Sequence, residues 1–406
     1  MFIRILDSLA SESAWYEPMF LKGFAMDDLK EALHLLDKLV SYPSVEGNEA
    51  EVGKFLAQYT RELGMQTELQ PVEGDRANVL ARVSLGSGGK TVILNSHMDV
   101  VPATDGWETD PYTLIVKDGR AYGRGSTDAK GALTAFLIAT KNIIEHPDGL
   151  NGTILFTAVV DEETCSKGAR YMAAHSALTA DYGIVGEPTM SNVFICHKGS
   201  IRPVIKIRGK SAHASTPELG ISAVRVASYL SDLVDEMHEA LLKLRHPILG
   251  NASVAITMLK AGVKENVLPD TCELVLDRRI VPGENEEEIK ASFDRLCCRA
   301  EEKFPGAQVF VERYIATTGP ASEVKPDSEI AQKAYAACES VTGIRQTPKG
   351  IDCNTDMNHL VRLGIPCVII GPGTLKVAHM PNEYVDLTQL ETACKVVERT
   401  IRSFLS

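Results

Sequence analysis

Apolar residues recur every three or four positions from about residue 27 onward. Residues 27–40 and 48–63 show this spacing, which is typical of amphipathic helices, and Gly64 marks the end of the second. Short apolar segments then alternate with helical ones. The predicted strands are 66–70, 78–83, 91–95, 152–160 and 182–186, and the predicted helices are 128–146 and 167–175. This alternation favours an α/β fold with a mostly parallel sheet that helices cover on both faces.

The pattern changes near residue 200 and changes back after residue 315. The elements in between follow the order strand, helix, strand, strand, helix, strand, which is typical of a ferredoxin-like α+β fold. The predicted strands are 201–208, 252–260, 272–281 and 308–315, and the predicted helices are 219–244 and 284–303. The α/β pattern then resumes with a helix at 328–341, a strand at 366–370 and a helix at 388–404.

We therefore predict one α/β domain formed by residues 26–199 and 316–406, interrupted by an inserted α+β domain at residues 200–315. Residues 1–25 precede this pattern. Two acidic residues interrupt their apolar positions, so we do not expect a signal peptide there. This segment is either an extension that docks onto the domain or a consequence of the choice of start site.

Composition narrows the possible partners. The chain has 406 residues with 54 acidic and 42 basic side chains, a net charge of −12, which makes nucleic acid an unfavourable partner. No uncharged apolar segment reaches the roughly 18 residues that a membrane span needs. The nine cysteines include no CxxC pair, which disfavours disulfides and a thiolate zinc site. We therefore expect a cytoplasmic protein without a nucleic-acid or membrane partner.

Five polar clusters follow the ends of predicted strands or precede a helix. In open α/β sheets, ligands bind beyond the carboxyl ends of the strands. The clusters are SHMDVVP at 96–102, GRGSTD at 123–128, DEE at 161–163, GEP at 186–188 and AHMPNE at 378–383. Each alone is weak, because a single histidine is usually structural, an acidic triplet is usually solvated, and Asp128 is a natural helix cap. Together they supply imidazoles and carboxylates without thiolates, a ligand set that suits zinc and also cobalt or manganese.

These motifs resemble the di-zinc amidohydrolysing peptidase family that includes acetylornithine deacetylase, succinyl-diaminopimelate desuccinylase, aminoacylases and glutamate carboxypeptidases. The similarity extends over nearly the whole chain from about residue 27, and the DEET, GEPT, HKGSI and AHMPNEY stretches look most like the acetylornithine deacetylases. The matching stretches are SHMDVVP, GRGSTDAKG, DEET, GEPT, KGSIRPVIKIRGKSAHAS, ENVLPD, LDRRIVPGEN and GPGTLKVAHMPNEY.

The resemblance implies a centre of two divalent metal ions, zinc by preference, with cobalt or manganese as alternatives. In the family pattern Asp128 bridges the two ions. His97 and Glu187 complete one site, and Glu163 and His379 complete the other. Two ions would balance three carboxylates and one hydroxide, so such a site suits a partly buried cleft.

Two further residues beside these ligands receive roles from the same resemblance. Asp99 would orient the His97 imidazole. Glu162 would act as the general base, taking a proton from the attacking water and passing it to the leaving amine. Adjacent side chains of an extended segment point in opposite directions, so Glu162 and Glu163 should not share one role. The family also predicts a cis peptide bond between Asp128 and Ala129.

The inserted domain and one late loop supply the residues expected to contact substrate. His213 would reach the active site of a partner subunit in a homodimer and stabilise the oxyanion. Asn266 and Arg279 would bind the substrate carboxylate, whereas Arg278 should point to the opposite face of the strand. Gly373 would bring a backbone N–H near the substrate.

We interpret the chain as a metal-dependent hydrolase that cleaves the amide bond of N-acyl amino acids. The alternatives are a dipeptidase or carboxypeptidase, or an enzyme similar to succinyl-diaminopimelate desuccinylase. A catalytically inactive binding protein is the least favoured reading, because every predicted ligand and the predicted base are present.

Overall fold

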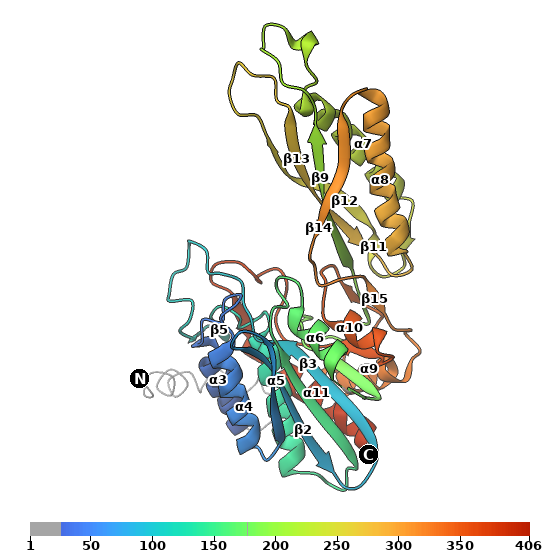
Figure 1. Cartoon of the computed structure of the whole chain (residues 1–406). Helices are drawn as coiled ribbons and strands as arrows, with labels where there is room; N and C mark the ends of the chain where they lie inside the picture. Colours follow the sequence, from blue (N-terminus) through green and yellow to red (C-terminus); the bar gives the residue numbers. More distant parts are fainter. Residues whose placement is uncertain (1–25, 177) are drawn as a thin grey trace. The chain divides into compact units, whose positions relative to one another are not determined.

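The computed structural model describes residues 26–176 and 178–406, which form two compact units (Figure 1). One unit contains the described residues up to Ile195 together with Val324–Lys349 and Thr355–Ser406. The other contains Cys196–Glu323 and Gly350–Asn354. The predictions for residues 1–25 lie outside the described residues.

The first unit is built on a six-stranded sheet with the order β1-β2-β6-β3-β7-β17. Its strands are β1 (Gln66–Glu73), β2 (Arg76–Leu85), β3 (Lys90–His97), β6 (Gly152–Val159), β7 (Tyr182–Val185) and β17 (Cys367–Ile369). β3 pairs in parallel with β6 and β7, and β7 pairs in parallel with β17, whereas β2 is antiparallel to both β1 and β6. The sheet is therefore mostly parallel, as predicted, with an antiparallel edge.

Helices pack along this sheet. They are α3 (Met26–Val40), α4 (Ala50–Glu62), α5 (Lys130–Glu145), α6 (Lys167–His175), α9 (Glu329–Thr342), α10 (Met357–Arg362) and α11 (Leu387–Leu405). α5 and α11 contact each other and the central strands β3 and β6, while α4 and α6 contact β1 and β2. α5 is buried along most of its length, because its small and apolar residues let other elements pack around it.

A second, three-stranded sheet brings the late part of this unit to its early part. It consists of β4 (Ile115–Lys117), β5 (Arg120–Tyr122) and β18 (Tyr384–Asp386) in the order β18-β5-β4. Each strand has three residues, which is too short for a visible alternation, and the sequence did not predict them. This sheet fixes the segment after His379 beside the loop that leads to Asp128.

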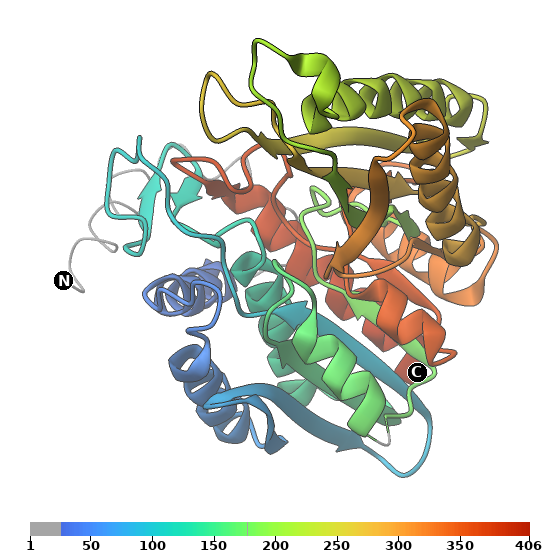
Figure 2. The ribbon, with the colours of Figure 1, turned by 45° about the horizontal axis from the view of Figure 1, so that its top comes forward.

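The second unit has the predicted ferredoxin-like order. Its sheet runs β12-β13-β9-β14, from strands β12 (Ser253–Ala261), β13 (Thr271–Ile280), β9 (Gly199–Arg208) and β14 (Gln308–Ile315). Helices α7 (Ala223–Leu241) and α8 (Glu286–Lys303) contact each other and pack on one face of this sheet (Figure 2).

Two boundaries of this unit differ from prediction. The helix expected at 219–244 is shorter, because a 3-10 turn at Pro217–Leu219 precedes it and the Ser222 side chain caps α7 by accepting the N–H of Arg225. The unit also extends beyond 200–315, because β8 (Cys196–His197) pairs with β15 (Ser322–Glu323) and β16 (Gly350–Ile351). Among the described residues, no helix has the length and apolar character needed to cross a membrane.

Candidate metal centre

The Asp128 carboxylate lies between two imidazoles. His97 ends the buried strand β3, and its Nε2 is 3.3 Å from Asp128 Oδ1. His379 approaches from the loop before β18, and its Nε2 is 3.3 Å from Asp128 Oδ2. Each carboxylate oxygen thus faces a different histidine, which is the arrangement that a bridging ligand requires.

The remaining predicted ligands lie close to His97 or Asp128. His379 Nε2 is also 3.0 Å from Glu163 Oε2. Ligand atoms of His97, Asp128 and Glu163 lie within 4.8 Å of one another, as do those of His97, Glu162 and Glu187. The structure therefore brings together the sequence-predicted ligands, which come from the ends of β3, β6 and β7 and from two loops.

Asp99 connects two parts of this centre. Its backbone carbonyl is 3.0 Å from His97 Nδ1, and its carboxylate Oδ1 is 3.5 Å from the same nitrogen. The carboxylate accepts hydrogen bonds from the backbone N–H groups of Glu162 at 3.1 Å and Glu163 at 2.9 Å. The carbonyl thus makes the closer contact with the imidazole, while the carboxylate holds the loop that carries both glutamates.

Glu162 and Glu163 do not lie on an extended segment, so the predicted alternation of their side chains is wrong. Residues 162–165 form a turn, not an extended segment. Consequently both carboxylates reach the centre, each in a different group of possible ligand atoms. The cis peptide bond expected between Asp128 and Ala129 is present.

Burial dominates the electrostatics of the glutamates. It raises the pKa of Glu162 and of Glu187 well above the usual range, and neighbouring carboxylates raise these pKa values further. Burial and the Asp128 charge raise the pKa of Glu163 to about 7. Several buried carboxylates in one place repel each other unless cations or protons neutralise them.

For His97, His379 and Asp128, by contrast, the contacts favour the charged form of the side chain. Burial would raise the pKa of Asp128, but hydrogen bonds from His379 and His97 outweigh it and hold this pKa below its usual range. Hydrogen bonds with Asp128 and Glu163 raise the pKa of His379 to about 10. Burial opposes the charge of His97, yet its contacts with Asp128 and Asp99 raise its pKa well above normal. The cluster of carboxylates around Asp128 therefore strongly favours positive charge. Its possible ligand atoms are imidazole nitrogens and carboxylate oxygens, which suit divalent zinc, cobalt or manganese.

Sequence reasoning missed two buried residues of this region. Asp356, just before α10, accepts a hydrogen bond from Asn95 Nδ2 at 3.2 Å, and its charge helps to raise the pKa values of Glu162 and Glu187. Lys130 begins α5, donates to the carbonyl of Tyr42 at 2.7 Å, and has its pKa lowered to about 7 by burial. Lys130 belongs to a recognised motif, whereas Asp356 has no local signal, because only the fold brings it here.

The predicted substrate residues of the second unit form two local groups. His213 Nδ1 accepts the N–H of Ser215 at 3.1 Å, which leaves Nε2–H as the donor of a neutral imidazole. Asn266 lies on the neighbouring segment, where its carbonyl accepts the N–H of Ala214 at 3.0 Å. Both His213 and Asn266 are exposed, so their side chains are accessible.

The two adjacent arginines of β13 point to opposite faces, as predicted. Arg278 is buried and pairs with Glu284. Arg279 is partly exposed, and its Nε donates to Asp277 Oδ1 at 2.7 Å, while Arg202 binds the other oxygen of the same carboxylate at 2.8 Å. A single carboxylate thus holds two guanidinium groups, which leaves one positive charge in excess.

The Gly373 N–H has a partner within the protein, and its predicted contact with substrate stays a prediction. Its N–H donates to Gln389 Oε1 at 2.9 Å, so contact with a substrate would require this bond to be exchanged. Its φ is +83°, and a Cβ here would lie 2.6 Å from the Thr127 hydroxyl oxygen. Glycine is therefore required for the close approach of this loop to the one before Asp128.

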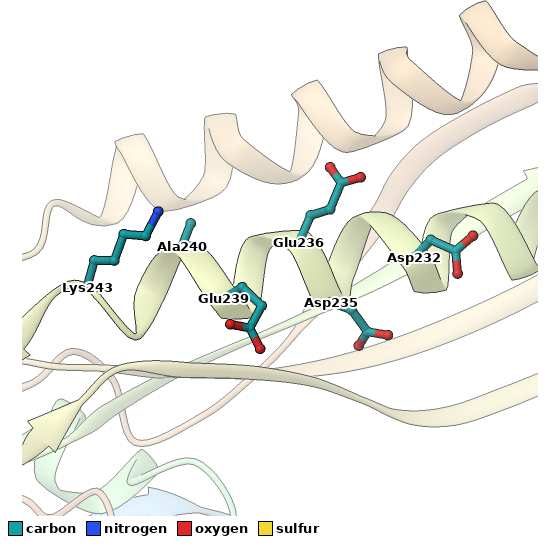
Figure 3. Close-up of a pocket in the computed structure, with 6 residues that line it drawn as sticks. All are labelled: Asp232, Asp235, Glu236, Glu239, Ala240 and Lys243. Carbon is teal, nitrogen blue, oxygen red and sulfur yellow. The ribbon is translucent and has the colours of Figure 1, made fainter.

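The second unit also has a hollow whose lining contains none of the predicted site residues. It follows α7, has a volume of about 540 Å³, and is lined by acidic side chains and Lys243 (Figure 3). Glu236 in this hollow pairs with Arg299 at 2.9 Å. No histidine or cysteine lines it, and we assign it no function.

Comparisons with known proteins show which proteins this chain resembles. The model of the peptidase family M20/M25/M40 matches residues 93–403. The acetylornithine deacetylase of Proteus mirabilis (strain HI4320) is 28% identical over 390 residues, which cover 92% of this chain and 96% of the relative.

Solved structures share the fold. A tripeptidase from Staphylococcus aureus subsp. aureus Mu50 is similar with a TM-score of 0.72 and 24% identity, covering 93% of this chain and 98% of its own. A dinuclear metal binding peptidase of the M20 family from Bacillus subtilis is similar with a TM-score of 0.70 and 17% identity, covering 94% and 99%. These likenesses confirm the predicted fold class.

Proposed function

Because this chain belongs to peptidase family M20/M25/M40, we propose that it hydrolyses the amide bond of N-acyl amino acids at a two-metal centre. The observation that carries the proposal is the position of Asp128, whose two oxygens face His97 and His379 separately. The similarity to an acetylornithine deacetylase over most of both chains favours deacylation and makes N-acetylornithine the first substrate to test.

Five residues would hold the ions. His97 and Glu187 would bind one ion, Glu163 and His379 the other, and Asp128 both. Zinc is our first choice, with cobalt or manganese as alternatives, because imidazole and carboxylate ligands suit all three. Bound metals would polarise the amide carbonyl and make water a better nucleophile at neutral pH.

Glu162 would move the proton. Its carboxylate lies in the same group of ligand atoms as His97 and Glu187, and burial raises its pKa. A carboxylate with a raised pKa is a stronger base, so Glu162 can take a proton from water and then give it to the departing amine nitrogen.

The second unit would act as a lid and dimerisation domain, and the first unit would be the catalytic domain. In a homodimer, His213 of one subunit would donate its Nε2–H to the oxyanion in the other subunit. Arg279 and Asn266 would bind the free carboxylate of the substrate, since a guanidinium pairs with a carboxylate through two hydrogen bonds. The sequence has nine cysteines and no CxxC pair, which supports a reducing, cytoplasmic location.

A pair of neighbouring substitutions tests the assignment. Glu162→Ala should keep both metals and lose roughly 10²- to 10⁴-fold in kcat, the usual contribution of a positioned acid or base. Glu163→Ala should instead lose metal, measured by elemental analysis of the purified protein. Metal loss in Glu162→Ala together with full metal content in Glu163→Ala would reverse the two roles.

A substrate screen separates the proposal from peptide hydrolysis, which the similarity to a solved tripeptidase keeps as the second candidate. The panel contains N-acetyl, N-succinyl and N-formyl amino acids together with dipeptides, with and without added zinc. We expect N-acetyl amino acids to be cleaved fastest. Faster cleavage of dipeptides than of every N-acyl amino acid would favour a dipeptidase.

A further inference from the structure

The loop that carries Asp128 is held by one buried carboxylate, that of Glu383. Glu383 Oε1 accepts the backbone N–H groups of Thr127 at 2.9 Å and Asp128 at 3.0 Å. Glu383 Oε2 accepts the N–H of Gly125 at 3.0 Å and a guanidinium N–H of Arg124 at 2.6 Å. Three N–H groups of one short loop therefore converge on a single side chain that is fully buried.

The same segment also supplies a predicted ligand. His379 lies four residues before Glu383 and contacts the Asp128 side chain, while Glu383 fixes the Asp128 backbone. Arg124 reinforces this connection, because its Nη2 also donates to the carbonyls of Pro102 at 3.3 Å and His379 at 3.5 Å. The 379–383 segment thus determines both where Asp128 sits and where the imidazole facing it sits.

We propose that Glu383 is a positioning residue that sets the Asp128 carboxylate for binding two metal ions at once, with Arg124 as its counter-charge. The inference rests on the proposed function, since it concerns the same two-metal centre. A bridging carboxylate must direct each oxygen to a different ion, so a small rotation of its backbone weakens both bonds. Glu383 binds the backbone of this loop and the Arg124 guanidinium, so its effect on the metals passes through the loop.

Replacing one acceptor tests this role. In Glu383→Gln, one oxygen becomes an NH₂ group, which cannot accept the N–H groups that now converge on it. Residues that orient metal ligands typically change metal affinity 10- to 100-fold when substituted. We expect zinc dissociation constants, measured by competition with a chromogenic chelator, to rise at least about tenfold. At saturating zinc we expect kcat to fall while KM changes little.

The buried pair of Lys395 with Glu391 provides a matched control. Glu391 is also buried and accepts from Lys395 at 2.8 Å, on helix α11, which carries none of the predicted ligands. Glu391→Gln should lower the melting temperature of the metal-free protein but leave zinc affinity unchanged. A merely structural role for Glu383 would make the two variants alike.

A double variant keeps the test decisive if Glu383→Gln does not fold. Arg124→Gln with Glu383→Gln leaves no unpaired buried charge, so it should fold and still bind zinc at least about tenfold more weakly. Wild-type zinc affinity and kcat in the double variant would overturn the positioning role and leave the proposed function intact. A wild-type protein that binds no divalent metal would overturn both.

Discussion

The side chains assigned to the metals and those assigned to the substrate are held in place by different kinds of contact. In the first unit, His97, Asp128 and His379 come from distant parts of the chain, and the buried Asp128 carboxylate contacts both imidazoles. In the second unit, His213 and Arg279 are held by Ser215 and Asp277, each two residues away. The metal centre therefore depends on contacts between distant parts of the chain, whereas the side chains of His213 and Arg279 are each held by a residue close in the sequence.

This difference predicts separable consequences. Substitutions of the predicted metal ligands in the first unit should change metal content and stability together, because neighbouring charges there neutralise each other. Substitutions in the second unit should change the handling of substrate without loss of metal.

The largest effect is expected for Asp128→Ala, which removes the residue shared by both ions. Metal content should fall for both sites, and kcat/KM should decrease at least about 10³-fold, since Lewis-acid activation contributes several kcal/mol to the transition state. Elemental analysis and a hydrolysis assay provide the two readouts. A variant that retained two tightly bound ions would break the bridging assignment.

Arg279→Ala should reduce kcat/KM by roughly 10- to 100-fold while metal content stays at the wild-type level, because a charged hydrogen-bonding partner of the substrate is lost. Arg279→Lys should recover only part, since an ammonium lacks the planar fork. N-acetyl amino acid amides serve as the control substrates. Equal turnover of these amides and the free acids by the wild-type protein would contradict the carboxylate clamp.

Mixing two inactive variants tests whether His213 works across a dimer. His213→Ala and Glu162→Ala subunits should together recover up to about a quarter of wild-type activity, because half of the randomly formed dimers would be mixed and each would hold one intact site. Subunit exchange is verified by mass spectrometry of the native dimers. Absence of recovery after complete exchange, or full activity of a monomer, would exclude the role in trans.

The smallest effect concerns the stability of the metal-free protein. The pKa of Glu163 is raised to about 7, and that of His379 to about 10, so the folded state binds more protons than the unfolded state above pH 4.5 for the glutamate and above pH 6.5 for the histidine. The corresponding stabilisation is present at low pH and lost as pH rises through these folded-state values. In a chelator, the melting temperature should be roughly 5 °C lower at pH 9 than at pH 6.

Added metal should reverse this trend, because metal binding requires deprotonated ligands and strengthens as pH rises. A metal-free melting temperature that increased from pH 6 to pH 9 would show that protons do not neutralise the carboxylates of the centre.

Long amphipathic elements were predictable from the sequence because their periodicity extends over several turns. The helix expected at 27–40 is α3 at Met26–Val40, and the strand expected at 308–315 is β14 with the same bounds. The three-residue strands β4, β5 and β18 carry no such pattern. Their existence depends on pairing between segments far apart in the chain, which a single sequence does not reveal.

The predicted metal ligands could be identified from the sequence, whereas the residues and turns that position them were harder to predict. Motifs identified His97 and Asp128 as candidates, because such side chains at element ends are unusual together. Glu383 stood in a recognised motif without a role, since its partners are backbone N–H groups that have no sequence signature. The turn at 162–165 was missed because an acidic triplet after a strand does not indicate its own backbone conformation.

The hydrogen bonds of Glu383 to the Asp128 loop can form only after both segments have been synthesised. These two residues are 255 positions apart, so a ribosome that adds 5–20 residues per second needs roughly 10 to 50 seconds to travel from one to the other. Once residue 187 has been added, the nascent chain carries His97, Asp128, Glu163 and Glu187 but still lacks the Glu383 side chain that binds the loop. High affinity for metal is therefore expected to arise only after the segment 379–383 has left the ribosomal exit tunnel.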